Sequence, residues 1–229
     1  NRLDLIENKI EVKEKENLLI RTNLEDKIEN LEKLSKMDPE LLKKYSKVYF
    51  LNEHYMPVSL SYIGVGSKST QSSNIQIHSD VLPYLEKLIS AGNLDNMGIR
   101  AQSAYRSFGK QSEIKSKALI TYGIGANKFS ADQGYSEHQL GTAIDFTTIK
   151  TAGVLDGFEK TPEYKWLLEN AYKYGFVISY PVGNSYYEFE PWHWRFVGVE
   201  LATKLHQDNK NFYDLDQRII DSYLVKLFD

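Results

Sequence analysis

Cysteine is absent from this chain of 229 residues. Its absence excludes a disulfide framework and every metal site built on thiolates. Histidine and carboxylate side chains must therefore supply the ligands of any metal ion, and the chain has five histidines. A metal centre has to be sought among few candidates.

Long apolar runs and an excess of basic charge are absent as well. No window of about 18 apolar residues could span a bilayer. Lys and Arg number 28 against 31 Asp and Glu, which gives a net charge of -3 and a pI near 6.0. The chain thus has no overall basic field for nucleic acid. We expect neither nucleic-acid binding nor membrane insertion, and the 41% hydrophobic content suffices for one globular domain plus an extension.

The sequence begins at Asn1 without an initiating methionine, and it shows no signal peptide. We expect that an export signal or membrane anchor belongs to the full-length protein.

Glycine and proline are missing from residues 3–37, a stretch rich in Glu, Lys, Leu and Asn. Apolar residues recur there at helical spacing from Ile20 to Leu34, which predicts one long helix or a helical hairpin. Lys27 interrupts the a/d heptad, so a helix packed on the domain is favoured over a stable coiled coil. Residues 1–40 are expected to be a helical extension or stalk, either an arm for self-association or a solvated helix, and residues 41–229 the domain.

Further along the chain, turn residues separate segments of regular periodicity. A linker is expected over residues 38–73, with the domain boundary near 40–55. Helices are expected from the N-cap Ser79 to Gly92, over 110–122, from Thr161 to Gly175, and over 199–206 and 215–228. Strands are expected over 98–105, 176–179 and 192–197, and residues 123–134 should form a loop bordering a substrate groove.

Two separated motifs carry metal-ligand chemistry. The first runs from Ser136 to Phe146 and contains His138 and Asp145, and the second runs from Glu190 to Arg195 and contains His193. Two imidazoles and one carboxylate match the ligand set of a catalytic zinc ion, which leaves a fourth position for water. Taken singly, each of these residues is more often a packed histidine or a turn aspartate. Strand alternation would turn Asp145 into a cleft and its neighbours Ile144 and Phe146 into the core.

Glu190 and Arg106 are the candidate catalytic residues. Pro191 stiffens the turn between Glu190 and His193, so the carboxylate can lie near a metal-activated water without being a ligand, and can act as general base. Arg106 could neutralise the tetrahedral oxyanion. The remaining histidines have no acidic companion at a useful spacing and are not candidates: His54, His78 and His206.

Aromatic residues near the motifs could wall a cleft for a small peptide. They are Tyr105, Phe108, Trp192 and Trp194. For Trp194 a core position is favoured, because strand alternation turns it away from His193, and Trp192 turns the same way.

Together the motifs resemble those of the VanY-related D-alanyl-D-alanine carboxypeptidases over about residues 48–200. The matching residues are Tyr105-Arg106-Ser107 with Gln111, Ser136-x-His138-x-x-Gly141-x-Ala143-x-Asp145, and Glu190-x-x-His193-Trp194-Arg195. The resemblance implies an α+β fold in which helices flank a small antiparallel sheet. It implies Zn²⁺ on His138, Asp145 and His193, with Glu190 as base and Arg106 on the scissile carbonyl. It also places Gln111 and Ser136 at positions that contact substrate.

The activity that this resemblance implies is removal of the terminal D-alanine from peptidoglycan stem peptides, as a D,D- or L,D-carboxypeptidase in the cell envelope. The alternatives are an endopeptidase or dipeptidase on the same scaffold and a non-catalytic zinc- or peptidoglycan-binding module. Retention of both Glu190 and Arg106 favours catalysis over a binding module. Two histidines and an aspartate would accept other divalent ions, although geometry and availability favour zinc.

Overall fold

The computed structural model describes residues 2–36, 51–64, 74–123, 126, 130–151, 153–184 and 187–228. The chain divides into two units, Asn1–Met37 and Asp38–Asp229. The expected linker and domain boundary fall largely on residues 37–50 and 65–73, which lie outside the described residues.

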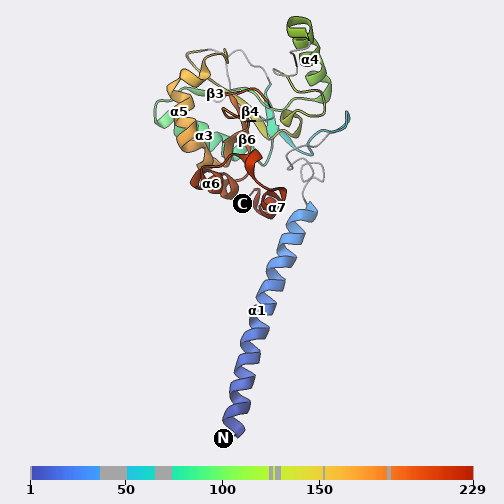
Figure 1. Cartoon of the computed structure of the whole chain (residues 1–229), viewed down its shortest axis with the longest axis vertical. Helices are drawn as coiled ribbons and strands as arrows, with labels where there is room; N and C mark the ends of the chain where they lie inside the picture. Colours follow the sequence, from blue (N-terminus) through green and yellow to red (C-terminus); the bar gives the residue numbers. More distant parts are fainter. Residues whose placement is uncertain are drawn as a thin grey trace. The chain divides into compact units, whose positions relative to one another are not determined.

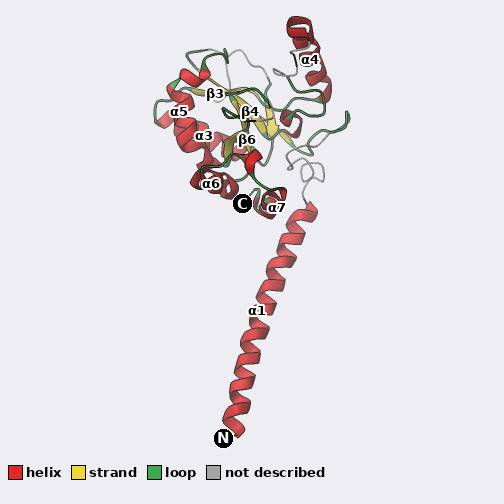
Figure 2. Ribbon diagram, in the orientation of Figure 1, coloured by secondary structure: helices red, strands yellow, loops and turns green. Residues whose placement is uncertain are grey.

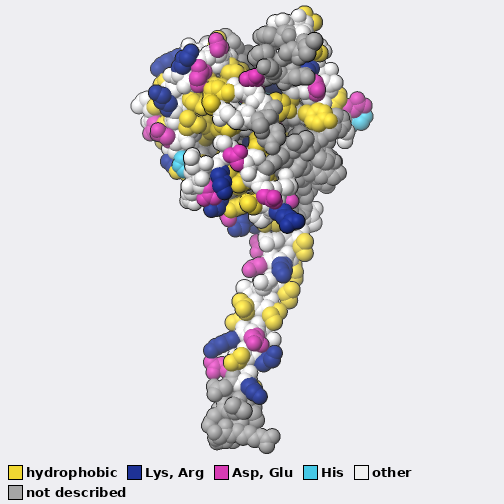
Figure 3. All heavy atoms as spheres, in the orientation of Figure 1, with side chains coloured by type: hydrophobic (Ala, Val, Ile, Leu, Met, Phe, Trp, Pro, Cys, Tyr) yellow, Lys and Arg dark blue, Asp and Glu magenta, His cyan; other side chains and the backbone are white. Residues whose placement is uncertain are grey.

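The first unit is the single helix α1 (Arg2–Lys36), rather than a hairpin (Figure 1). Pairs of opposite charge one turn apart support it, among them Lys15–Glu11 at 2.7 Å and Arg21–Glu25 at 2.8 Å. Several large apolar side chains along this helix are more than half exposed, and Figure 3 shows them between charged ones. Within the described residues, no helix combines the length and the apolar character that crossing a membrane requires.

The second unit is built on an antiparallel sheet of four strands in the order β3-β4-β6-β5 (Figure 2). The strands are β3 (Ile99–Ser103), β4 (Ala143–Thr148), β6 (His193–Phe196) and β5 (Phe176–Ile178). A separate two-stranded antiparallel sheet joins β1 (Leu60–Tyr62) to β2 (Gln76–His78). The predicted fold class, helices around a small antiparallel sheet, is confirmed.

The two faces of the larger sheet have different roles. One face is apolar: Ile144 on β4 lies opposite Trp194 on β6, and the ring of Phe146 contacts the rings of Trp194 and Phe176. Helices α3 (Leu82–Leu94), α5 (Pro162–Asn170) and α6 (Val199–Asp208) lie together beside the sheet (Figure 1) and supply further buried residues of this core. Trp194 is 2% exposed, as its predicted core position requires. The other face carries Asp145, His193 and Arg195.

The remaining helices complete the domain. They are α4 (Phe108–Tyr122), α7 (Gln217–Ser222) and the 3-10 helices η3 (Glu137–Leu140), η4 (Phe158–Lys160), η5 (Ala171–Tyr174), η6 (Phe212–Asp214) and η7 (Leu224–Lys226). Thr161 caps α5 by accepting a hydrogen bond from the backbone N–H of Tyr164. The following 3-10 turn ends at Gly175, whose φ of 82° favours glycine, as expected.

Three expectations were wrong. Ser79 does not cap α3, which starts after Val81, because its hydroxyl bonds those of Ser59 and Ser61 instead. The closing segment 215–228 is not one helix but a short helix followed by a 3-10 turn. The expected linker contains strand β1, and two other residues of the same stretch, Leu51 and Ile63, are buried in the core.

Candidate metal and catalytic site

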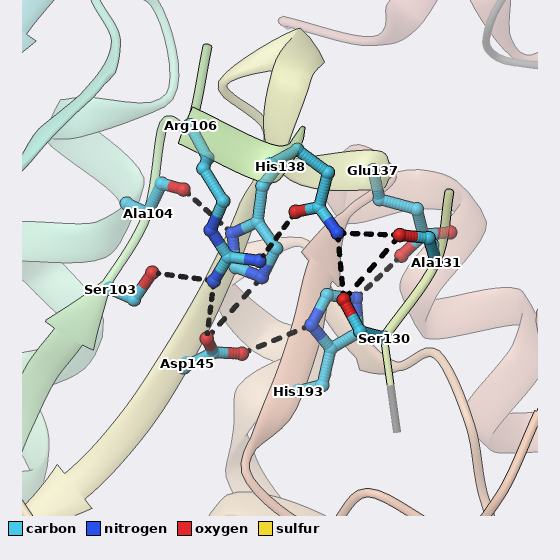
Figure 4. Close-up of polar contacts among 10 residues, drawn as sticks. Ser103, Ala104, Arg106, Ser130, Ala131, Glu137, His138, Asp145 and His193 are labelled. Carbon is cyan, nitrogen blue, oxygen red and sulfur yellow. Dashed lines mark hydrogen bonds and ion pairs between the residues drawn. The ribbon is translucent and has the colours of Figure 1, made fainter. Parts of the chain in front are cut away.

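The polar face of the sheet brings the three candidate metal ligands together. Asp145 on β4 and His193 on β6 are direct cross-strand partners, so their side chains leave the same face. His138 comes from η3, which precedes β4. The ligand atoms of these three residues lie within 4.8 Å of one another, and all three residues are buried. Figure 4 shows the two imidazoles converging on the carboxylate.

Hydrogen bonds fix which atom each group presents. His138 Nδ1 lies 2.6 Å from the carbonyl of Ala104, so this nitrogen donates and Nε2 presents its lone pair to Asp145 Oδ2 at 3.3 Å. His193 Nε2 lies 2.8 Å from a Glu137 carboxylate oxygen, and its Nδ1 lies 3.1 Å from Asp145 Oδ1. A cation between the rings and Asp145 would take the lone pair of His138 Nε2 and, once its proton is lost, that of His193 Nδ1, and would also contact the carboxylate. The donor set therefore fits a divalent metal such as zinc.

The charges around the cluster shift its titration strongly. Burial raises the pKa of Asp145, but the nearby His138 and His193 outweigh it and hold that pKa well below its ordinary value. Burial lowers the pKa of His138, which keeps that ring neutral and able to bind a metal. For His193, burial is outweighed by hydrogen bonds to Asp145 and Glu137, which raise its pKa to about 10, so a metal ion at Nδ1 would have to displace the proton that this nitrogen donates to Asp145.

Glu190 lies at the wall of the same pocket and is not one of the three clustered ligands. Burial raises its pKa to about 7, and the negative charge of Asp145 acts in the same direction. A carboxyl with a pKa near neutrality is suited to general-base catalysis, because it is ionised and still basic at working pH. The backbone carbonyl of Glu190 accepts a hydrogen bond from the N–H of His193, which ties the turn to the start of β6.

Arg106 is held at the mouth of the site by three groups. Its guanidinium donates to Gln111 Oε1 at 2.9 Å and to Ser103 Oγ at 3.1 Å, and lies 3.5 Å from Asp145 Oδ2 (Figure 4). The register shift between Ala101 and Ser103 in β3 places Ser103 opposite Asp145. The backbone N–H of Arg106 donates to the carbonyl of His138. The guanidinium therefore reaches the cluster of His138, Asp145 and His193 with a fixed orientation.

Gln111 is the residue that secures this orientation. It is 1% exposed, and its amide donates to Ser130 Oγ at 3.1 Å and to the carbonyl of Ala131 at 2.7 Å while its oxygen accepts from Arg106. Every polar atom of its side chain thus has a protein partner. Gln111 lines the pocket but acts on the site through Arg106 in this arrangement.

A pocket of about 210 Å³ opens over the cluster. Besides the residues already placed, Ser136 and Trp192 line it, as do Ser130 and Ala131 from the loop expected to border a groove. Trp192 precedes the first residue of β6, so strand alternation does not turn it away as Trp194 is turned. Tyr105, Phe108 and Trp194 are not among the lining residues. Tyr180 and Tyr187 line it and were not predicted.

Sequence reasoning also missed Glu137, although it lies beside His138. This carboxylate is 3% exposed and contacts His193, Arg195, Ser179 and Tyr213. Its position between Ser136 and His138 in the first motif was a signal, but nothing in the sequence shows which residues approach it.

Comparison with known families and curated proteins gives consistent matches. The family model of VanY, D-alanyl-D-alanine carboxypeptidase, matches residues 74–199. YodJ of Bacillus subtilis (strain 168), assigned as a carboxypeptidase, is 34% identical over 190 residues, which cover 80% of this chain and 68% of that protein. A D-alanyl-D-alanine carboxypeptidase of Enterococcus faecalis (strain ATCC 700802 / V583) is 34% identical over 150 residues, 59% of this chain and 53% of the relative. The chain thus spans about half to two thirds of these relatives.

Solved structures share the fold. The LdcB LD-carboxypeptidase superposes with a TM-score of 0.66 at 30% identity, over 72% of this chain and 80% of its own. A mutant of the vancomycin-resistance D,D-pentapeptidase VanY, solved with Zn(II), gives a TM-score of 0.59 at 29% identity, over 74% of this chain and 98% of its own.

Proposed function

The chain belongs to the VanY family of D-alanyl-D-alanine carboxypeptidases, and we propose that it removes the C-terminal D-alanine from peptidoglycan stem peptides with the help of a bound zinc ion. The observation that carries the proposal is the convergence of His138, Asp145 and His193 within 4.8 Å at the base of a pocket that also holds Glu190 and Arg106. The Zn(II) complex of the related VanY enzyme supports the choice of metal.

We assign the ligand atoms from the hydrogen bonds on the far side of each ring. His138 would bind through Nε2, because its Nδ1 contacts the carbonyl of Ala104, and His193 through Nδ1, because its Nε2 contacts Glu137. Asp145 supplies a carboxylate oxygen between them. A zinc ion held by these residues would act as a Lewis acid that polarises a carbonyl and makes water more acidic.

The residues of the pocket perform the proton transfers and stabilise charge. Glu190 takes a proton from the attacking water while the water oxygen bonds to the scissile carbonyl carbon. The same carboxyl then passes that proton to the amine of D-alanine as the C–N bond breaks. The guanidinium of Arg106 stabilises the negative charge that develops on the carbonyl oxygen. Ser136 and Trp192 contact the peptide from the pocket wall.

Competing activities differ in how the substrate extends beyond the scissile bond. The related structures include an LD-carboxypeptidase and a D,D-pentapeptidase. Which length of stem peptide this protein prefers is therefore a question for experiment. An endopeptidase or dipeptidase would use the same ligands. A binding module has no need for a general base, and the raised pKa of Glu190 favours an enzyme over such a module.

A substrate in the cell wall implies that the protein acts outside the cytoplasm, and we propose that the full-length protein is secreted or anchored to the membrane.

We also propose that α1 self-associates as a parallel pair. In one heptad frame the a positions are Ile10, Asn17, Leu24 and Leu31, all exposed.

The charged residues beside these a positions would be complementary in a parallel pair. Lys9 faces Glu14 of a second copy, and Glu16 faces Arg21 of a second copy, both at the g-to-e spacing that favours parallel pairing. Lys13 and Lys27 occupy d positions, so the pair should be weak. Sedimentation of the protein with and without residues 1–36 tests it: concentration-dependent dimers that need the helix support it, and a monomer at all concentrations rules it out.

Release of D-alanine from a synthetic stem pentapeptide tests the function. Protein stripped with a chelator should be inactive, and zinc added back should restore release. A zinc-loaded protein that releases no D-alanine from pentapeptide or tetrapeptide would overturn the proposal.

A further inference from the structure

Glu137 is a buried carboxylate that receives four hydrogen bonds. Ser179 Oγ donates to Oε2 at 2.7 Å, and His193 Nε2 donates to the same oxygen at 2.8 Å. Arg195 Nη1 and the hydroxyl of Tyr213 both donate to Oε1 at 2.7 Å. A carboxylate taken this far from water requires such partners to remain charged.

Arg195 is the positively charged partner of Glu137 in this network, with its Nη1 lying 2.7 Å from Oε1. Arg195 is itself 2% exposed, and its guanidinium lies 4.3 Å from the ring centre of Phe212 on η6. The carboxylate and the guanidinium thus form a buried ion pair next to His193.

The network also fixes the imidazole of His193. Because Glu137 accepts from the Nε2–H, Nδ1 is the nitrogen of His193 that is left to bind a metal, and it faces Asp145. The ring of Tyr180 stacks on that of His193 at 4.8 Å with an interplanar angle of 2°, which restricts its rotation. The hydrogen bond and the stacked ring together hold the imidazole in the orientation that presents Nδ1 to Asp145.

We propose that Glu137, together with Arg195 and Tyr213, positions His193 as a metal ligand and sets the zinc affinity of the site. This inference rests on the zinc site proposed above and deepens it. Tyr213 lies on η6, beyond the residues 74–199 that match the family model. The C-terminal segment therefore contributes to the metal centre and does more than cover the core.

Zinc affinity of the Glu137→Gln variant tests the proposal. Glutamine keeps the size of the side chain and removes the charge that holds the Nε2–H of His193. Competition of the metal-free protein with a chromophoric chelator should show zinc binding weakened by about 10- to 100-fold, the usual cost of losing such a partner. The absorption spectrum of the cobalt-substituted protein should change as well, because it reports ligand geometry that fold stability alone does not alter.

Tyr213→Phe serves as the milder variant, because it removes one hydroxyl and no charge. It should weaken zinc binding by a smaller factor, and it decides the matter if Glu137→Gln does not fold. Tyr62→Phe is the matched control, since Tyr62 lies on β1 and is 65% exposed. That control should bind zinc as the wild type does.

Wild-type zinc affinity and an unchanged cobalt spectrum in folded Glu137→Gln, or in Tyr213→Phe if the first does not fold, would overturn the positioning role while leaving the proposed peptidase activity intact. Failure of the proposed activity would be recognised separately, by a wild-type protein that binds zinc but releases no D-alanine. In that case weakened zinc binding in the variants would still support the positioning role.

Discussion

Replacing Glu190 by glutamine isolates the chemical step from metal binding. Glutamine has the same shape but cannot accept the proton of the attacking water. Burial raises the pKa of Glu190 to about 7, close to the value at which a general base is most effective at neutral pH. Loss of a general base costs roughly 100- to 10,000-fold in rate. At about 1.4 kcal/mol per tenfold, the barrier should rise by about 3 to 5.5 kcal/mol.

The assay is steady-state release of D-alanine by zinc-loaded Glu190→Gln and wild-type protein, with zinc content measured on the same samples. Because Glu190 is not part of the ligand cluster, kcat should fall while zinc stoichiometry stays at the wild-type value. A variant that retains zinc and more than about a tenth of wild-type kcat would refute the assignment of Glu190 as base, since that loss is well below the expected range.

Three further predictions follow from the same site and its scaffold. The kcat/KM of the wild type should decline as pH falls through the pKa of Glu190, at or below about 7, because the base becomes protonated and a bound cation can only lower that pKa. Arg106→Lys keeps the charge but loses the planar fork, and should reduce kcat by about 100-fold in the D-alanine assay. Gly175→Ala should lower the melting temperature more than Gly183→Ala, because both glycines have φ near 80° but an added Cβ at Gly175 would lie 2.5 Å from a ring carbon of Phe196.

Each of these has a contradicting result. A kcat/KM that stays constant between about pH 5 and pH 8 would remove Glu190 from the rate-limiting chemistry. Wild-type kcat in Arg106→Lys would show that charge alone suffices. Equal melting temperatures for the two alanine variants would mean that the ring of Phe196 moves aside without cost.

The clustering of His138, Asp145 and His193 could be predicted from sequence because these residues lie on, or next to, well-defined strands. Asp145 follows an alternating apolar pattern in β4, and His193 starts β6, so cross-strand pairing brings them together. The order and spacing of the motifs then pointed to a third ligand at His138. The core position of Trp194 followed from the same alternation.

Long-range contacts could not be predicted in this way. Glu137 forms hydrogen bonds with Arg195 and Tyr213, which are 58 and 76 residues away along the chain. A local sequence pattern does not predict contacts over such separations. Strand β1 was hidden in a segment whose Pro, Gly and Ser residues are typical of a linker. Ser79 is a residue type typical of a helix cap, but its hydroxyl bonds those of Ser61 on β1 and of Ser59 just before that strand.

Mass spectrometry of a synthetic stem pentapeptide and tetrapeptide, incubated with the protein under zinc and under chelator, tests the central claim most directly. The account predicts loss of a single C-terminal D-alanine from at least one peptide, only with zinc present. Products cut at an internal bond, loss that persists in chelator, or intact peptides beside a zinc-loaded protein would contradict it.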